Sequence, residues 1–491
     1  MLSVCSIVLR LFKEFVTAMI RFRKFFPNQW LKSMKLAIGI IASSLVLGLT
    51  LLLSLHPAQA QKPFTGTPAV KPAYFDRLQA TIDKDRDRLI NLFKDIHQNP
   101  ELAFMETRTA AIVARELKAL GYEVKTGIAK TGVVGILRNG DGPKVMYRAD
   151  LDALPVQETT GLPYASTKRA EMPDGSEVPV MHACGHDAHT VWMLGLAKAM
   201  VNLKSNWKGT LILVGQPAEE GVAGARAMVE DGLYTRHGVP VPDFLLGMHS
   251  APGPTGIIAS VPGIRTAGSD PIDIVFKGVG GHGSSPHLAK DPILMAAHAI
   301  TQYQSIVARA INPQEAAVIT VGSVQAGEAN NVIPGEALLR LSLRWFNPEV
   351  RKIMVQGIKS VNESIARAYG MPEDQLPTLT AKGGTTPLVN DKAVIDRINP
   401  QLANLVGANK LIADFPGTTG SEDVHLLKGD NKNIQVGFVF VGVAEPALFA
   451  KARAEGRTVP FSNHNSNFQV DLNAIPFGTK VASVMTMELL N

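Results

Sequence analysis

From about residue 75, segments with apolar residues at helical spacing alternate with short apolar runs bounded by turn residues, and this alternation constrains the fold most. The runs "VVGILRN", "KVMYRADL", "GTLILVGQP" and "PDFLLGMHS" have the length and composition of buried strands. Amphipathic helices are predicted over residues 75–100 and 106–122, and further helices near Thr190–Leu203 and Ala223–Asp231. The pattern predicts an α/β fold, a doubly wound mixed sheet.

The pattern changes near Thr266. "DPIDIVFKG" and "EALLRLSLRWF" alternate apolar and polar residues, as strands with one buried face do. The order strand, helix, strand, strand, helix, with "LPTLTAKGG" as a possible last strand, predicts an inserted α+β, ferredoxin-like domain over residues 266–385. The first domain is then discontinuous and comprises residues 75–265 and 386–491.

Residues 1–60 have the features of a leader. Leu36–Leu55 is a continuous apolar run, and Ala58-Gln59-Ala60 has the small-x-small form of a signal-peptidase site. We expect cleavage after Ala60 and export to the periplasm or the exterior. The alternative is an uncleaved membrane anchor formed by residues 36–55. Met34 could itself start such a signal, which would make residues 1–33 an upstream extension.

The basic character of the chain comes from this leader. Residues 1–60 contain seven Lys or Arg and one acid, a formal charge of +6 that equals that of the whole chain. The remaining 61–491 are therefore neutral overall. The sequence pI of about 9.1 does not indicate a nucleic-acid partner.

The stretch "VMHACGHDAHT" holds three histidines and Cys184. The only other cysteine is Cys5, so a chain without its leader has no intrachain disulfide. Cys184 is then a buried thiol, a nucleophile beside a histidine, or a metal ligand. Complete inhibition by chelators, reversed by metal, would exclude the nucleophile.

Polar residues follow the predicted strands. Asp150 and Asp152 end one strand, Glu219-Glu220 another, and His249 a third. In doubly wound sheets the ligand crevice lies at the carboxyl ends of the strands, so these groups can converge. Cys184 and His186 would join them from the loop that leads into the helix at Thr190. A thiolate, imidazoles and a carboxylate suit zinc or a similar transition metal.

Eight motifs then occur in a recognisable order: "RADLDALP", "MHACGHDAH", "GQPAEEG", "GMHS", "GGHGSSPH", "NNVIPGEA", "GSEDV" and "NHNSNF". In these motifs the chain resembles the aminoacylase/carboxypeptidase family of di-metal peptidases, in the branch of hippurate hydrolases and auxin-conjugate hydrolases. The resemblance covers roughly residues 75–490. It implies two divalent metal ions, zinc or manganese, with cobalt possible in vitro.

The resemblance also implies a role for each matching residue. Cys184 would bridge the two ions, His186 and His249 would complete the ligands of one ion, and Glu220 and His464 those of the other. Sister branches carry a His-x-Asp ligand motif where this chain has Arg148-Ala149-Asp150, so His186 would take the place of the missing ligand. Glu219 resembles the general base, and Asp150 and Glu422 would hold the ligands in position.

Three residues of the inserted domain would act on the substrate. The resemblance implies that His282 stabilises the oxyanion, often from the partner subunit of a dimer. Asn331 and Arg344 would contact the substrate, Arg344 through its free carboxylate. The alternatives are an incidental histidine in a glycine-rich hairpin for His282 and a cross-strand ion pair for Arg344. We expect a homodimer formed through the inserted domain.

The predicted function is that of an exported, metal-dependent amidohydrolase that cleaves the amide bond of N-acyl amino acids by metal-activated water. The first alternative is a metallo-carboxypeptidase or dipeptidase acting on short peptides. A catalytically inactive binding relative is the alternative from another class. The chain departs from the family pattern in "NHNSNF", which lacks a proline often found after the histidine, and in the longer loop "PDGSEVPV". These departures concern the substrate rather than the metal ligands.

Overall fold

The computed structural model describes residues 61–172 and 174–491. The predicted signal peptide, its cleavage after Ala60 and the alternative anchor at residues 36–55 all lie outside the described residues. No helix in these two described ranges combines the length and apolar character needed to cross a bilayer.

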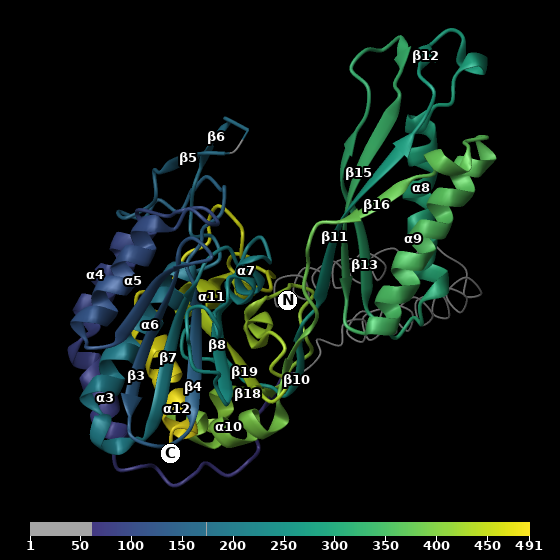
Figure 1. The fold of residues 1–491 in the computed structure, drawn as a ribbon. Helices are drawn as coiled ribbons and strands as arrows, with labels where there is room; N and C mark the ends of the chain where they lie inside the picture. The colour runs from purple at the N-terminus through teal and green to yellow at the C-terminus, as the bar shows by residue number, and fades with distance from the viewer. Residues whose placement is uncertain (1–60, 173) are drawn as a thin grey trace, which may run out of the picture. The chain divides into compact units, whose positions relative to one another are not determined.

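The largest sheet has nine strands in the order β1-β18-β9-β19-β8-β4-β7-β3-β2 (Figure 1). Its four central strands, β19, β8, β4 and β7, run parallel, and antiparallel pairs join β7 to β3 and β3 to β2. In sheet order the strands are β1 Lys62–Pro63, β18 Leu411–Asp414, β9 Ile258–Ala259, β19 Gln435–Ala444, β8 Phe244–Pro254, β4 Lys144–Asp150, β7 Gly209–Gln216, β3 Gly132–Asn139 and β2 Glu123–Ile128.

Helices cover this sheet on both faces, which explains why its central strands are apolar throughout. In β7, Leu211 and Leu213 point into one hydrophobic cluster, and Ile212 and Val214 into another. The larger cluster packs against α3 Phe75–Lys84, α4 Arg86–His97, α5 Thr107–Ala119, α6 His186–Asn202, α10 Lys392–Val406 and α12 Ala474–Leu489. The other packs against α7 Gly224–Glu230 and the short helix η7 Val424–Lys428. The predicted doubly wound mixed sheet is confirmed.

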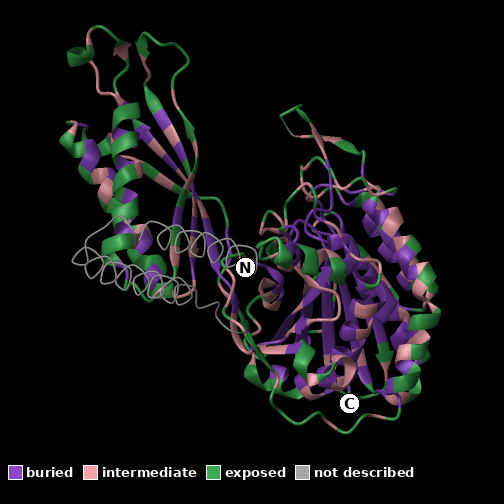
Figure 2. Ribbon diagram, turned by 180° about the vertical axis from the view of Figure 1, so that it is seen from behind, coloured by how far each residue is buried: buried purple, intermediate pink, exposed green. Residues whose placement is uncertain are grey.

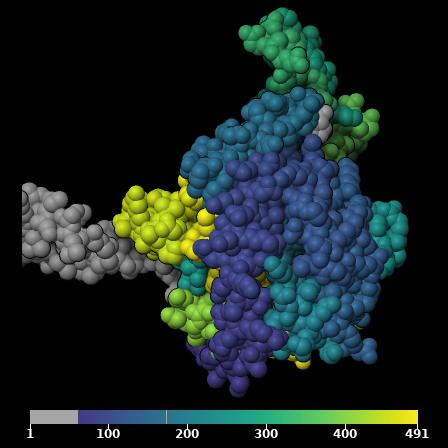
Figure 3. Space-filling model, turned by 90° about the vertical axis from the view of Figure 1, so that its left-hand side faces the viewer, coloured from purple at the N-terminus to yellow at the C-terminus, as the bar shows by residue number. Residues whose placement is uncertain are grey.

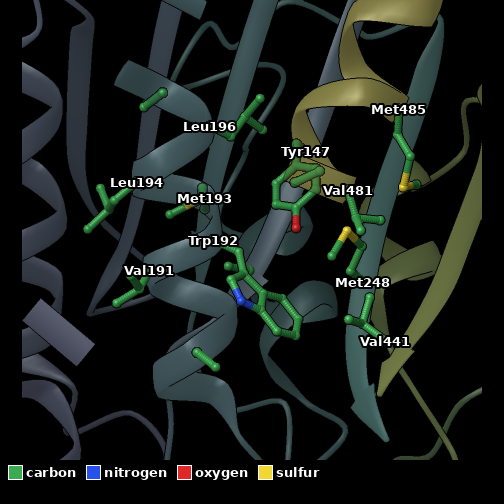
Figure 4. Packing of buried hydrophobic residues seen from close by; sticks show 14 of the residues in the cluster. Tyr147, Val191, Trp192, Met193, Leu194, Leu196, Met248, Val441, Val481 and Met485 are labelled. Carbon is green, nitrogen blue, oxygen red and sulfur yellow. The ribbon is translucent and has the colours of Figure 1, made fainter. Parts of the chain in front are cut away.

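Helix α6 is buried on all sides, between the sheet and the outer helices. Trp192 is fully buried among apolar side chains (Figure 4). Its Nε1 donates to the carbonyl of Ala474 in α12. Such a helix has no polar face, and its sequence accordingly lacks an amphipathic pattern. The buried residues, purple in Figure 2, concentrate in this sheet and in α6. In Figure 3 the early part of the described chain, in purple, forms much of the surface that is turned toward the viewer.

A second sheet has four antiparallel strands in the order β13-β15-β11-β16. It has a hydrophobic cluster of its own, formed with two helices. In chain order these elements are β11 Gly268–Lys277, α8 Pro292–Ser305, β13 Ala317–Gln325, β15 Glu336–Trp345, α9 Pro348–Ala368 and β16 Thr378–Ala381. The predicted ferredoxin-like order of strands and helices is therefore present, with "LPTLTAKGG" containing its last strand.

Short pairs of strands complete the described elements. They are β5 Arg169–Glu171 with β6 Glu177–Pro179, β10 Gly263–Thr266 with β17 Leu388–Asn390, and β12 Gly281–His282 with β14 Val332–Ile333. The pair β10–β17 joins the two chain segments that lead into and out of the four-stranded sheet. Helix α11, Pro446–Ala454, follows β19.

Two predicted helix boundaries are wrong. The first predicted helix is two helices, α3 and α4, separated at Asp85, whose carboxylate binds Arg88 and Lys198. Helix α6 begins at His186 rather than at Thr190. Gly185 has a left-handed φ of 82°, and a Cβ there would lie 2.7 Å from Ser250 Oγ. Glycine therefore permits a sharp turn directly into the helix, and His186 lies in its first turn.

Candidate metal centre and active site

The predicted ligands lie at the topological switch point of the large sheet. Strand β4 has β7 on one side and β8 on the other, and ligands of such sheets bind where the strand order reverses. Cys184 and His186 come from the start of α6, Glu220 follows β7, and His249 lies in β8. His464 comes from the loop between α11 and α12, and its backbone N–H donates to the carbonyl of Ala183 at 2.7 Å.

Two sets of three donors share the sulfur of Cys184. One set is Cys184, His186 and His249, the other is Cys184, Glu220 and His464, and within each set the donor atoms lie within 4.8 Å of one another. Cys184 Sγ is 3.4 Å from His249 Nε2, and Glu220 Oε2 is 3.4 Å from His464 Nε2. Two ligands of one tetrahedral ion, with bonds of about 2.0–2.3 Å, are roughly 3.3–3.8 Å apart. The structure thus brings all five predicted ligands together in the arrangement of a two-ion site.

The unsatisfied polar atoms of this cluster fit divalent cations. His186 Nε2 and Glu220 Oε1 are buried and have no hydrogen-bond partner among the described residues. Burial alone would raise the pKa of the Cys184 thiol, but His249 and the other neighbouring imidazoles lower it well below its usual value. A thiolate, a carboxylate and three imidazoles are ligands that zinc and related transition metals bind. Three donors per set leave a position open for water or substrate.

Glu219 lies beside this cluster and is 6 % exposed. Its Oε2 is 3.8 Å from His186 Nε2. Burial, with the charges of Glu422 and Glu220, raises the pKa of Glu219 well above its usual value. A nearby dication would offset that repulsion between carboxylates. Unlike Glu220, Glu219 belongs to neither of the two sets that contain Cys184, although it forms a further set with His186 and Glu220.

The loop that carries Glu219 is held by a residue that the sequence analysis did not identify. Glu106 is fully buried, and its Oε1 accepts from the backbone N–H of Ala218 at 2.9 Å. Ala218 has a left-handed φ of 51°, which is uncommon for a residue other than glycine. In sequence, Glu106 looks like an ordinary acidic residue at the start of a helix. Its contact is with a backbone distant in sequence, and such contacts leave no local pattern.

Asp152 positions two of the predicted ligands. His186 Nδ1 lies 2.9 Å from its backbone carbonyl and 3.2 Å from its Oδ1, while its Oδ2 accepts from the backbone N–H of Glu220 at 3.0 Å. Asp150, which the sequence analysis gave as a supporting residue, has its Oδ2 3.7 Å from His186 Nε2. Asp152 therefore makes the kind of hydrogen bond that orients a ligand imidazole. In the sequence, its position just after β4 was the feature that could have identified it.

Asp150 is connected to His249 through His189 and the backbone of Ser250. Its Oδ1 is 2.7 Å from His189 Nδ1, and His189 Nε2 accepts from the backbone N–H of Ser250 at 2.8 Å. The carbonyl of the same Ser250 lies 2.7 Å from His249 Nδ1. Asp150 thus retains the predicted supporting position, but on the side of the cluster that includes His249.

Arg148 is fully buried and joins Asp150 to the predicted supporting residue Glu422. Its guanidinium donates to Asp150 Oδ2 at 2.8 Å and to Glu422 Oε2 at 3.2 Å, and lies 3.0 Å from Asp423 Oδ1. Burial alone would lower the pKa of Arg148, but these carboxylates outweigh it and raise the pKa. Arg148 is therefore the internal counter-ion of this acidic region.

His282 and Asn331 lie together, and no described contact joins them to the ligand cluster. His282 is in β12 and pairs with Val332 of β14, beside Asn331, whose carbonyl accepts from Gly283 N at 2.8 Å. Both residues are exposed, and β12 marks the outer end of the green segment in Figure 1. The site that this single chain forms is therefore not completed by His282.

Arg344 lies nearer to the predicted site. It is half-buried in β15, and its Nη1 donates to Ser421 Oγ at 2.5 Å, next to Glu422. Burial lowers the pKa of Arg344. No carboxylate among the described residues lies within ion-pair distance, so the alternative of a cross-strand ion pair is wrong.

Together, the mixed sheet and the paired donor sets define a class of protein, the metal-dependent hydrolases with two adjacent ions. Comparison with known families agrees. The model for peptidase family M20/M25/M40 matches residues 146–481, and the chain belongs to this family. The predicted family resemblance is confirmed, and the protein is a hydrolase that acts on amide bonds.

Individual relatives make the comparison more specific. Hippurate hydrolase of Campylobacter jejuni is 45 % identical over 275 residues, which are 56 % of this chain and 68 % of the relative. N-acetyl-L-cysteine deacetylase of Bacillus subtilis is 34 % identical over 365 residues, 74 % of this chain and 81 % of the relative. Among solved structures, the Bacillus subtilis YXEP protein, described as a dinuclear metal-binding peptidase of the M20 family, has a TM-score of 0.65 and 29 % identity, covering 83 % of this chain and 99 % of that one.

Proposed function

We propose that the protein is an exported amidohydrolase that removes the acyl group from N-acyl amino acids. The observation that carries the proposal is the pair of donor sets that share Cys184, with the buried carboxylate of Glu219 beside them. Its substrate class is supported by the two relatives above, whose names specify hippurate and N-acetyl-L-cysteine. Export rests on the sequence of residues 1–60, and the uncleaved anchor remains its alternative.

Two divalent ions, zinc or manganese, would be held by Cys184, His186, Glu220, His249 and His464. When bound, such ions polarise an amide carbonyl and lower the pKa of water. Glu219 would take a proton from the attacking water and deliver it to the leaving nitrogen. The buried position of Glu219 restricts competing proton exchange with solvent, and Glu106 keeps its loop in place through Ala218.

The four-stranded sheet and its helices, within residues 266–385, would form a lid that also makes the dimer. Arg344 would bind the substrate carboxylate, since its guanidinium has only Ser421 as a described side-chain partner. His282 and Asn331 would reach the site of the partner subunit. This arrangement is supported by their exposure and by the absence of contacts to the ligand cluster within the described chain.

A substrate panel on the purified protein tests the proposal, alongside metal analysis. Benzoyl-glycine and N-acetyl amino acids should be hydrolysed, and unblocked dipeptides should not. A chelator should abolish activity, and zinc or manganese should restore it. Preference for dipeptides would indicate the peptidase alternative, and activity that survives complete metal removal would indicate Cys184 as a nucleophile. Failure of all substrates with both ions bound would favour an inactive binding relative.

A further inference from the structure

A basic surface pocket lies behind the two loops that carry Glu219 and Glu422. It has a volume of about 760 Å³ and is walled by α7, by η7 with the residues that follow it, and by Thr386. Helix α7 follows the Glu219 loop, η7 follows Asp423 directly, and Thr386 lies in the segment that returns from the four-stranded sheet. The mechanism above uses none of the residues that line this pocket.

The lining carries an excess of positive charge. Arg226, Lys428 and Lys432 line the pocket, and none of them has a carboxylate within ion-pair distance among the described residues. Glu230 is the one acid in the lining. With His425 neutral, the three cations and the one acid give the lining a formal charge of +2.

A buried imidazole, that of His425, lies in the wall of this pocket. Thr386 Oγ1 lies 2.9 Å from His425 Nε2, and His425 Nδ1 is buried without a hydrogen-bond partner among the described residues. Burial, together with Lys428, lowers the pKa of His425 to about 4, so the ring is neutral near pH 7. When the threonine hydroxyl donates to Nε2, Nδ1 carries the proton of the neutral ring. Because Nδ1 is buried, this N–H group does not add to the exposed donors of the pocket.

The pocket is also connected to the segment that carries the four-stranded sheet. Arg226 donates from Nη2 to the carbonyl of Gly384 at 2.8 Å, which leaves its other guanidinium N–H groups available. Arg226 therefore links α7, behind the candidate base, to the chain that leaves β16.

We propose that this pocket binds a phosphate group, either free phosphate or the phosphate of a small metabolite. A phosphate monoester carries about −1.5 to −2 charges at pH 7, which matches the lining charge and exceeds that of a simple carboxylate. Lys428 and Lys432 would supply point charges, and Arg226 would supply a planar pair of donors. The site is separate from the metal ligands and does not depend on the substrate assignment.

Calorimetric titration of inorganic phosphate and of glycerol 3-phosphate into the metal-loaded full chain tests the proposal. Lys428→Gln and Lys432→Gln should each weaken binding about tenfold, because each removes a charged hydrogen-bond donor. Glu230→Gln should strengthen binding, because it removes the one negative charge of the lining. Tighter binding of the ester would identify a phosphorylated metabolite as the ligand, and equal or weaker binding would identify free phosphate.

Lys410→Gln is the matched control, because Lys410 is exposed, has no described ion-pair partner and lies outside the pocket lining. Phosphate held by the metal ions would bind equally to the wild type and to all four variants. That result, or the absence of saturable binding, would overturn the proposal. Weaker binding in the two pocket lysine variants, with binding to Lys410→Gln and the metal content unchanged, would establish the site.

Discussion

The ligand cluster and the strand pair β12–β14 differ in how far one chain completes them. At the cluster, side chains from the ends of β4 and β7, from β8, from α6 and from the loop of His464 converge. A buried network holds them in place. Asp152 contacts His186, His189 accepts from the backbone of Ser250, and Arg148 pairs with three carboxylates. At the strand pair, His282 and Asn331 are exposed, and His282 pairs with Val332 and contacts Ser284. The donors of the first region fit divalent ions, whereas under the proposed function the second region would join a site only against another surface.

This difference suggests a division of labour. A site that must hold two cations depends on precise donor positions, which buried hydrogen bonds provide. A residue that acts on the oxyanion needs access to the substrate and can come from a surface that docks later. We therefore expect substitutions in the two regions to separate metal binding from catalysis.

The largest effect is expected for Glu219→Gln. The variant retains the shape of the side chain but cannot accept a proton, so kcat should fall by about 10²–10⁴-fold. Metal content should stay at the wild-type value, because Glu219 lies outside the two donor sets that share Cys184. Steady-state kinetics and metal analysis of the same preparation check both statements. Near wild-type turnover would show that another group is the base.

His282→Ala should lower kcat by about 10²–10³-fold through loss of an oxyanion donor, with metal content unchanged. Mixing provides the sharper test. In a dimer with sites shared between subunits, co-expression of Glu219→Gln with His282→Ala leaves one of the two sites intact in each mixed dimer. Because about half of the dimers are mixed when the subunits pair at random, about a quarter of wild-type activity should return. If His282 acts within its own chain, no activity should return.

Asp152→Asn should weaken metal affinity by about 10–100-fold, because it disturbs the hydrogen bonds to His186 and to the Glu220 backbone. Competition with a chelating indicator measures this affinity without reference to turnover. Asp414→Asn, which removes an exposed carboxylate paired with Lys62, serves as the control and should not change it. Equal affinities in the two variants would contradict the positioning role of Asp152.

The smallest effect concerns His97, which is buried against Asp187 and Glu158 near the ligand cluster. Burial alone would lower the pKa of His97, but hydrogen bonds to Asp187 and Glu158 outweigh it and raise the pKa to about 9. Because the folded value lies above the unfolded value of 6.5, the stabilisation is complete below pH 6.5 and is lost as the pH rises through about 9. The difference in Tm between the wild type and His97→Gln should shrink over that interval. A constant difference would contradict a charged His97.

Much of this architecture could be predicted from the sequence because its signals are local. Apolar runs identified the central strands, and the ordered motifs brought the five ligands and Glu219 into one hypothesis. The break at Asp85 was missed because helical spacing continues across it, and the start of α6 was missed because it depends on the close approach of Gly185 to Ser250. Asp152 and Glu106 act partly through backbone groups distant in sequence, which no motif records.

The most direct test of the account is an anomalous difference map from crystals of the metal-loaded protein. The account predicts two peaks, each within about 2.3 Å of Cys184 Sγ if zinc is bound. One peak should also contact His186 and His249, and the other Glu220 and His464. A map in which the sulfur contacts one ion only, or neither, would contradict the central claim that Cys184 joins two metal ions.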